Sequence, residues 1–145
     1  NPPRVFIFDC DALASSELNL VLRAWKQDFR FAAHARNLEV LLASRAGDRD
    51  SLRKLSVERG GHRYLFVPRL MTCGKAEESC RKVGGHLVTL EINAADDFIA
   101  SICPPAVPFW GCSHHSPGPK VFNGGSCTDE PDEDARNCFV IQWDE

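Results

Sequence analysis

Several features that would narrow the class of protein are missing from this sequence of 145 residues. Its seven cysteines include no Cys-x-x-Cys pair, so the common zinc-ribbon and thioredoxin-like motifs are excluded. No apolar run approaches the roughly 20 residues of a membrane-spanning helix, and no Asn-x-Ser/Thr acceptor site for N-glycosylation is present. The first residues, Asn1-Pro2-Pro3-Arg4, lack the hydrophobic region of a signal peptide, so we expect a mature, processed start.

The composition is that of an ordinary soluble globular protein, with 43% apolar and 26% charged residues. A net charge of −3 gives no electrostatic reason to expect nucleic-acid binding. The charges are unevenly spread, because residues 1–60 carry ten Lys/Arg and eight Asp/Glu, whereas residues 61–145 carry seven and twelve. Five of the acidic residues lie within Asp129–Asp134, which is therefore a local anionic segment.

Cysteine is abundant for a chain of this length. This density is typical of an oxidising compartment, so we expect a secreted protein or one on the extracellular face of the plasma membrane. The odd number leaves a free thiol, an intermolecular bond, or a partner outside this chain. Six of the seven cysteines lie in the second half: Cys73, Cys80, Cys103, Cys112, Cys127 and Cys138.

The first 60 residues predict a short α/β segment. Arg4–Cys10 is an apolar run that predicts a buried strand, and Ser15 or Ser16 could cap the helix after it. Asn37–Ala43 fits either a strand or a helix, while Asp50–Leu55 predicts a short capped helix. The spacing of the first helix predicts a core stripe of Leu18, Val21, Leu22, Trp25 and Phe29.

The sequence pattern changes after Gly60-Gly61, where we place a domain boundary. Glycines able to adopt positive φ follow an amphipathic helix, and a β-branched, half-buried strand comes next. The predicted series is a strand, a helix, a glycine stop, a strand and a second short helix: Tyr64–Val67, Thr72–Val83, Gly84-Gly85, His86–Leu90 and Asn93–Ser101.

This ordered series resembles the C-type lectin-like domain over about residues 62–145. Phe109-Trp110-Gly111 is similar to the family's Trp-Ile-Gly core strand, with the tryptophan shifted by one place, and Asn137–Ile141 resembles the strand with the third half-cystine. The resemblance implies an α+β fold with two helices, small antiparallel sheets and a long loop region. The chain would then be a short α/β segment (1–60) followed by a C-type lectin-like domain (61–145) that lacks its last strands.

A member of this family is expected to be an extracellular recognition module that binds a protein or glycan ligand without catalysis. Asn123–Asp132 is similar to the loop that carries the family's calcium motif. Several carboxylates at close spacing suit calcium, which takes six to eight oxygen ligands. The alternatives are a calcium-dependent carbohydrate-binding lectin and a solvated acidic loop without metal. The candidate ligand-binding residues are Glu130, Asp132 and Asp134, and the candidate calcium ligands are Glu130, Asp132, Glu133 and Asp134.

The triplet Glu130-Pro131-Asp132 is a hybrid of the mannose-type and galactose-type patterns and leaves the sugar class open. Two departures weaken the calcium reading. Gln142–Glu145 contains Trp-Asp, whereas sugar-binding members have Trp-Asn-Asp, and the long loop is short at Ser113–Lys120, where family members usually have more chain. Family members without the full ligand set commonly bind proteins or other surfaces.

The resemblance also implies disulfides. In the family, the helix cysteine (Cys80 here) bonds to the last strand, and the third half-cystine (Cys138) bonds to a cysteine shortly after it; neither partner follows. A second polypeptide could supply the final strands, or the N-terminal strand could replace them, with Cys10 bonded to Cys80. Cys127 and Cys138 could close a hairpin around the acidic loop.

A competing motif lies at the N-terminus. Phe6–Asp11 is similar to the first Asp-x-Asp motif of haloacid-dehalogenase-type phosphatases, in which one carboxylate attacks phosphate and the other acts as acid and base. The later motifs of that family have no clear place here, and Asp9 and Asp11 at a strand end are more often caps or turn formers. His114-His115 fits an exposed loop and His86 a packed or hydrogen-bonded residue. The sequence therefore predicts no enzyme.

Overall fold

A computed structural model of the chain describes residues 8–9, 13–91, 97–104, 106–114, 118–123, 126–129 and 134–144. The fold is mixed α+β, as predicted. In chain order the elements are β1 (Phe8–Asp9), α1 (Ser15–Lys26), the 3₁₀ turn η1 (Phe29–Phe31), α2 (Ala32–Ala46), α3 (Arg49–Leu55), β2 (Val57–Arg59), β3 (His62–Met71), α4 (Cys73–Lys82), β4 (His86–Leu87), β5 (Thr89–Leu90), α5 (Asp97–Ile102), β6 (Phe109–Ser113), β7 (Pro119–Asn123), β8 (Ser126–Asp129) and β9 (Asn137–Asp144).

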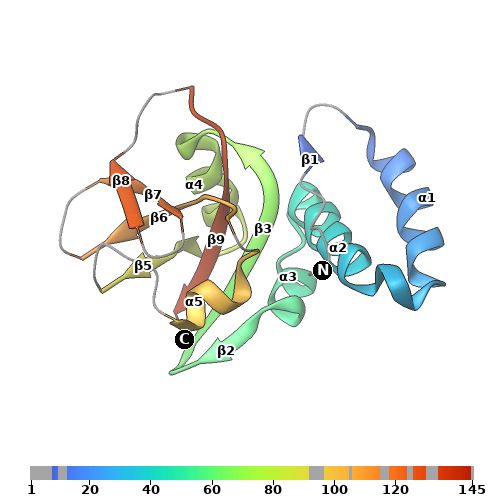
Figure 1. Ribbon diagram of the computed structural model, residues 1–145, viewed down its shortest axis with the longest axis horizontal. Helices are drawn as coiled ribbons and strands as arrows, with labels where there is room; N and C mark the ends of the chain where they lie inside the picture. Colours follow the sequence, from blue (N-terminus) through green and yellow to red (C-terminus); the bar gives the residue numbers. More distant parts are fainter. Residues whose placement is uncertain are drawn as a thin grey trace.

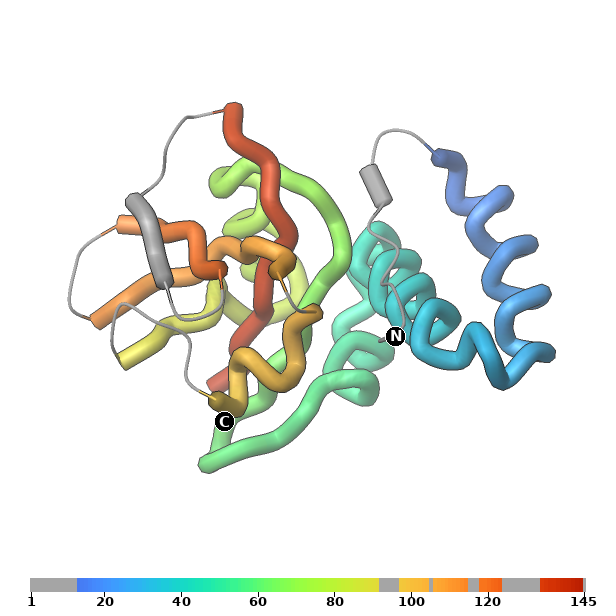
Figure 2. Tube along the Cα trace, viewed as in Figure 1, coloured from blue at the N-terminus to red at the C-terminus, as the bar shows by residue number. Residues whose placement is uncertain are grey.

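The described strands form one sheet in which β1-β3-β9-β6-β7-β8 are successive neighbours, while β2, β4 and β5 pair with β3, β9 and β6. Helices α1, α2 and α3 lie on one side of β3. Strand β9 lies on the other side, followed by β6, β7 and β8 (Figure 1). The tube in Figure 2 shows the same arrangement. None of the helices in the described part of the chain is both long and apolar enough to cross a membrane.

Helix α1 departs from its predicted core stripe. Leu18 is buried against α2, with Leu22 and Trp25 packed beside it, but Val21 faces outward and Phe29 is 90% exposed. The helix ends at Lys26 and a separate 3₁₀ turn begins at Phe29, so the helical spacing does not continue to that residue. The predicted serine cap is also wrong, because the N-cap residue is Ala14 and makes no side-chain hydrogen bond.

Helices α2 and α3 share a core with the sheet. Asn37–Ala43 is helical, which settles the alternative left open by periodicity. Gly47, at φ +66°, ends α2, and Asp48 caps α3 by accepting a hydrogen bond from Ser51 N. Val40 and Leu52 bring these two helices into the same hydrophobic cluster as β3 and β9.

The centre of the sheet is the antiparallel pair of β3 and β9, in a register that places His62 opposite Asp144 and Leu65 opposite Ile141. The boundary expected at Gly60-Gly61 falls in the turn of the β2–β3 hairpin. The first 60 residues are therefore joined to the rest by strand pairing as well as by a shared core.

The segment from α4 to β5 follows the predicted series closely. Thr72 caps α4, whose buried face carries Ala76 and Cys80, and Gly84 has φ +79°. The predicted strand His86–Leu90 is interrupted at Val88, whose N–H donates to Val140 O and whose carbonyl accepts from Cys112 N. The chain thus changes partners at Val88, from β9 to β6, which is why two short strands replace one.

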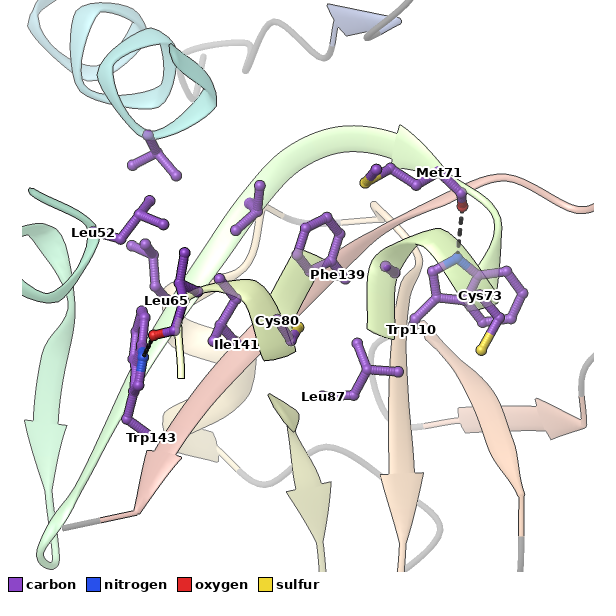
Figure 3. Close-up of a cluster of buried hydrophobic side chains, with 14 residues drawn as sticks. Leu52, Leu65, Met71, Cys73, Cys80, Leu87, Trp110, Phe139, Ile141 and Trp143 are labelled. Atoms are coloured by element: carbon purple, nitrogen blue, oxygen red, sulfur yellow. Dashed lines mark hydrogen bonds between the residues drawn. The ribbon is translucent and has the colours of Figure 1, made fainter. Parts of the chain in front are cut away.

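Two tryptophans anchor the core. Trp110 and Trp143 are 0% and 1% exposed, as predicted for core residues. The Trp110 indole donates to Met71 O at 2.8 Å and the Trp143 indole to Val83 O at 2.9 Å. Figure 3 shows these rings in the cluster that also holds Cys80, Leu87 and Phe139. Each indole ties a strand to the end of another element, at the end of β3 and just beyond α4.

Candidate functional site

The predicted acidic site is only partly described. Glu130, Asp132 and Glu133 lie outside the described residues, and Asp134 is an exposed residue just before β9. Among the described side chains, no group of three or more His, Cys, Asp or Glu is arranged to hold a metal ion. The calcium site therefore stays a prediction, and the structure brings a different set of polar residues together.

Those residues meet around Asp144 at the end of β9. Strand β3 pairs with one edge of β9 so that His62 faces Asp144, and β4 pairs with the opposite edge so that His86 faces Gln142. His62 Nδ1 lies 2.7 Å from Asp144 Oδ1, and His86 Nε2 lies 2.7 Å from Asp144 Oδ2. One carboxylate therefore contacts two imidazoles from two neighbouring strands.

His86 has a close polar contact on each ring nitrogen. Its Nδ1 lies 2.7 Å from the carbonyl oxygen of Leu87, and its Nε2 lies 2.7 Å from Asp144 Oδ2. The ring is therefore held between the backbone of β4 and the end of β9.

Gln142 completes the cluster from within β9. Its amide Nε2 donates to Asp144 Oδ1 at 2.8 Å, and its Oε1 accepts from Thr89 N at 3.0 Å. Burial alone would raise the pKa of Asp144, but the hydrogen bonds from Gln142 and His86, the charge of His86 and the contact with His62 together lower that pKa. Asp144 is thus held as a carboxylate.

A cavity of about 360 Å³ opens beside this cluster. It is lined by His62, Tyr64, His86, Thr89, Glu91, His114, Gln142 and Asp144. A second cavity, of about 240 Å³, shares four of these residues and extends to Arg59 and Phe98. The Tyr64 and Phe98 rings meet edge to face at 5.5 Å, and the Arg59 guanidinium lies 4.7 Å from the Phe98 ring centroid. Aromatic rings beside convergent donors and acceptors are typical of a site for non-covalent binding.

Four of the described cysteines are poor nucleophiles. Burial raises the pKa of Cys103 and of Cys138 to about 12, and it also raises the pKa of Cys80 and of Cys112. A buried thiol of raised pKa carries little thiolate at neutral pH. These residues therefore lack the activation that a catalytic cysteine needs.

The predicted disulfides are not made in this structure. Cys80 and Cys138 are thiols, and Cys10 lies outside the described residues. Four neighbouring strands connect these two cysteines: Cys138 on β9 pairs with Phe109 on β6, Phe109 pairs with Phe122 on β7, and Phe122 pairs with Cys127 on β8. Cys127 therefore lies three strand spacings, about 14 Å, from Cys138. This exceeds the Cα separation of a disulfide. The strand order therefore gives no support to a hairpin closed by Cys127 and Cys138.

The N-terminal strand also differs from its predicted role. Its described part, β1, pairs in parallel with β3 at Arg69 and Leu70, whereas β9 lies on the opposite edge of β3. The opposite edge of β3 is thus occupied by β9 and not by the N-terminal strand. Asp9 ends β1, and Asp11 of the phosphatase-like motif lies outside the described residues.

Sequence reasoning placed His86 correctly as a hydrogen-bonded residue but missed the cluster around it. His62, Gln142 and Asp144 carry no motif, and they meet only through the register of β3, β4 and β9. The one available signal was that a histidine begins β3 and β4 and that an aspartate ends β9. Comparison with known proteins adds no assignment, since no family model, curated protein or solved structure matches the chain.

The Asp144 cluster predicts a pH-dependent contribution to stability. Because the pKa of Asp144 is lowered from its ordinary value of 3.8, the carboxylate stabilises the fold above that value and loses this effect as the pH falls through the lower, folded-state pKa. The side chain is 55% exposed, so we expect Asp144→Asn to cost less than about 1 kcal/mol at pH 7. Thermal unfolding from pH 7 to pH 2 should show the two proteins converging in acid.

Asp50→Asn, at an exposed position on α3, is the matched control for this change. Its difference from the original protein should not follow the same pH profile. A constant gap between Asp144→Asn and the original protein across the whole range would contradict the assigned role of Asp144.

Proposed function

We propose that this protein is a non-catalytic recognition module of the C-type lectin-like type, secreted or on the extracellular face of the plasma membrane, that binds a protein ligand. The observation that carries the proposal is the closed unit formed by β3, α4, the Gly84-Gly85 stop and β4, which returns to β9 beside β3. These elements follow one another in the order of the family resemblance.

The position of Cys80 adds support. In the family, the corresponding helix cysteine bonds to the last strand. Here Cys80 is fully buried and packs in one cluster with Phe139 and Ile141 of β9. The same helix face is therefore held against a central strand, here through a hydrophobic contact.

Non-covalent binding also agrees with the chemistry of the described side chains. The cavity beside Asp144 offers carboxylates, imidazoles, an amide and aromatic faces, and the described cysteines with raised pKa values do not supply an activated nucleophile. The ligand contacts that we propose are Glu130, Asp132 and Asp134 on the acidic loop, with the Asp144 cavity as a second contact region.

Calcium separates the proposed protein-binding function from its alternative, a calcium-dependent carbohydrate-binding lectin. We expect calorimetric titration with calcium chloride to give no binding heat and thermal unfolding to be unchanged by calcium. A calcium-dependent rise in Tm that is lost in Asp132→Asn would instead establish the lectin, with Glu130, Asp132, Glu133 and Asp134 as the ligand set.

Ligand capture tests the proposal itself. The full chain is applied to arrays of extracellular protein domains and of glycans, each in calcium and in a chelator. We expect binding to a protein domain that persists in the chelator and is weakened at least tenfold by Asp134→Lys but not by Asp50→Lys. Binding to neither array, or equal loss in both variants, would overturn the proposal.

A further inference from the structure

Cys103 and Cys138 are brought together by the path of the chain between α5 and β6. Cys103 directly follows α5, and a turn closed by a hydrogen bond from Val107 N to Pro104 O reverses the chain before β6 begins at Phe109. Phe109 is the direct pairing partner of Cys138 across β6 and β9. The turn therefore returns Cys103 to the neighbourhood of the strand position occupied by Cys138.

Packing gives the same placement. Cys138 is 0% exposed within a cluster that contains Phe109, Val140 and Ile99, and Cys103 packs against that cluster from its edge. A negative charge on Cys138 would also raise the pKa of Cys103, as expected for two sulfurs in one apolar site. In contrast, the strand order sets Cys127 about 14 Å away from Cys138.

We propose that Cys103 and Cys138 form a structural disulfide when the protein meets a small-molecule disulfide oxidant such as oxidised glutathione. Cys103 is the more exposed of the two and reacts first. Its thiolate attacks one sulfur of the oxidant, forms a mixed disulfide and releases one thiol. Cys138 then gives up its proton and attacks the Cys103 sulfur, which releases the second thiol. Two protein thiols are oxidised and one oxidant disulfide is reduced.

The disulfide would link the two ends of a long segment of the chain. The segment between Cys103 and Cys138 contains β6, β7, β8 and the acidic loop Asp129–Asp134. Closing a loop of this length restricts the unfolded chain strongly. The disulfide would also join the two ends of the stretch of sequence that contains the acidic loop, so redox state would act on the segment that we propose contacts the ligand. The bond itself does not depend on that proposed function.

Peptide mapping tests the pairing directly. The full chain is refolded in a glutathione redox buffer, alkylated and digested without reduction. Trypsin cuts after Lys120 and Arg136, which separates Cys127 from its neighbours, and chymotrypsin at Phe109 and Trp110 separates Cys103 from Cys112. We expect a linked pair of peptides that carry Cys103 and Cys138. Alkylated Cys103, or Cys138 linked to any other cysteine, would overturn the proposal.

Stability gives a second readout. We expect the oxidised protein to unfold roughly 5–10 °C above the reduced protein, and Cys103→Ser to abolish this difference. Cys112→Ser, at another half-buried cysteine, should keep it. Loss of the difference in Cys112→Ser but not in Cys103→Ser would assign the bond to Cys112 and refute the pairing.

The rate of oxidation of the folded protein should depend steeply on pH. Since burial raises the pKa of Cys103 to about 12, the thiolate fraction rises about tenfold for each pH unit between 7 and 10. Oxidation at pH 9 should thus be close to tenfold faster than at pH 8. A rate that does not change over this range would show that Cys103 is not the thiol that attacks the oxidant.

Discussion

Gly85→Ala is expected to lower the free energy of unfolding by about 3 kcal/mol. A Cβ atom at this position would lie 2.8 Å from Ile141 Cγ2, 2.9 Å from the backbone oxygen of Gln142 and 3.2 Å from the Trp143 indole nitrogen. The oxygen belongs to β9, which is paired with β3 and β4, so it cannot move aside without disturbing the sheet. Urea unfolding followed by far-ultraviolet circular dichroism measures the loss.

Gly84→Ala is the matched control, because the neighbouring glycine is needed for a different reason. Gly84 has φ +79°, and a Cβ atom there would come no closer than 3.7 Å to the Arg49 side chain. The cost is therefore only that of a left-handed backbone, about 1–2 kcal/mol. Gly84→Asn should recover part of it, since asparagine tolerates this conformation. A larger loss at Gly84 than at Gly85 would refute this division of roles.

The two glycines show where sequence reasoning succeeds. Helix termination depends on local conformation, and the pattern of an apolar face followed by Gly84 predicted the end of α4 correctly. The requirement at Gly85 is invisible in the sequence, because it comes from β9, more than fifty residues later. Local signals of this kind also predicted the short helix α3.

The candidate site is non-local in the same sense. His62, His86 and Asp144 are far apart in sequence, and each belongs to a strand whose partner and register the sequence leaves open. A shift of one residue in the pairing would turn every side chain to the opposite face and separate them. The interruption at Val88 and the position of Cys127 were missed for the same reason, since both depend on which strands are neighbours.

The error at Phe29 has a local cause instead. The apolar spacing predicted a helix that continues past Gln27 to Phe29. Instead, Asp28 accepts a hydrogen bond from Arg30 N and begins a separate 3₁₀ turn. A single capping residue thus ended the helix and placed a large aromatic ring in solvent. Capping signals should outweigh apolar spacing wherever the two disagree.

Replacement of Trp143 should have the largest effect of any substitution considered. Trp143→Ala removes a ring that is 1% exposed and leaves Val83 O, next to a residue that is itself 2% exposed, without the indole donor. Loss of the ring alone costs about 3–5 kcal/mol, and an unsatisfied acceptor adds about 1–3 kcal/mol. We therefore expect a loss of about 4–8 kcal/mol, a large share of the stability of an ordinary domain.

Trp143→Phe separates the two effects, because it keeps much of the apolar ring and removes only the donor. Its loss should be about 2–3 kcal/mol, and Trp25→Ala, a half-buried tryptophan on α1, should cost less than Trp143→Ala. The Gly85 Cβ position lies 3.2 Å from the same indole nitrogen, so Gly85→Ala should cost less in the Trp143→Phe background than alone. If the losses in free energy of unfolding measured in urea are strictly additive, the indole does not crowd the Cβ atom at position 85. The steric clash would then come from the β9 backbone.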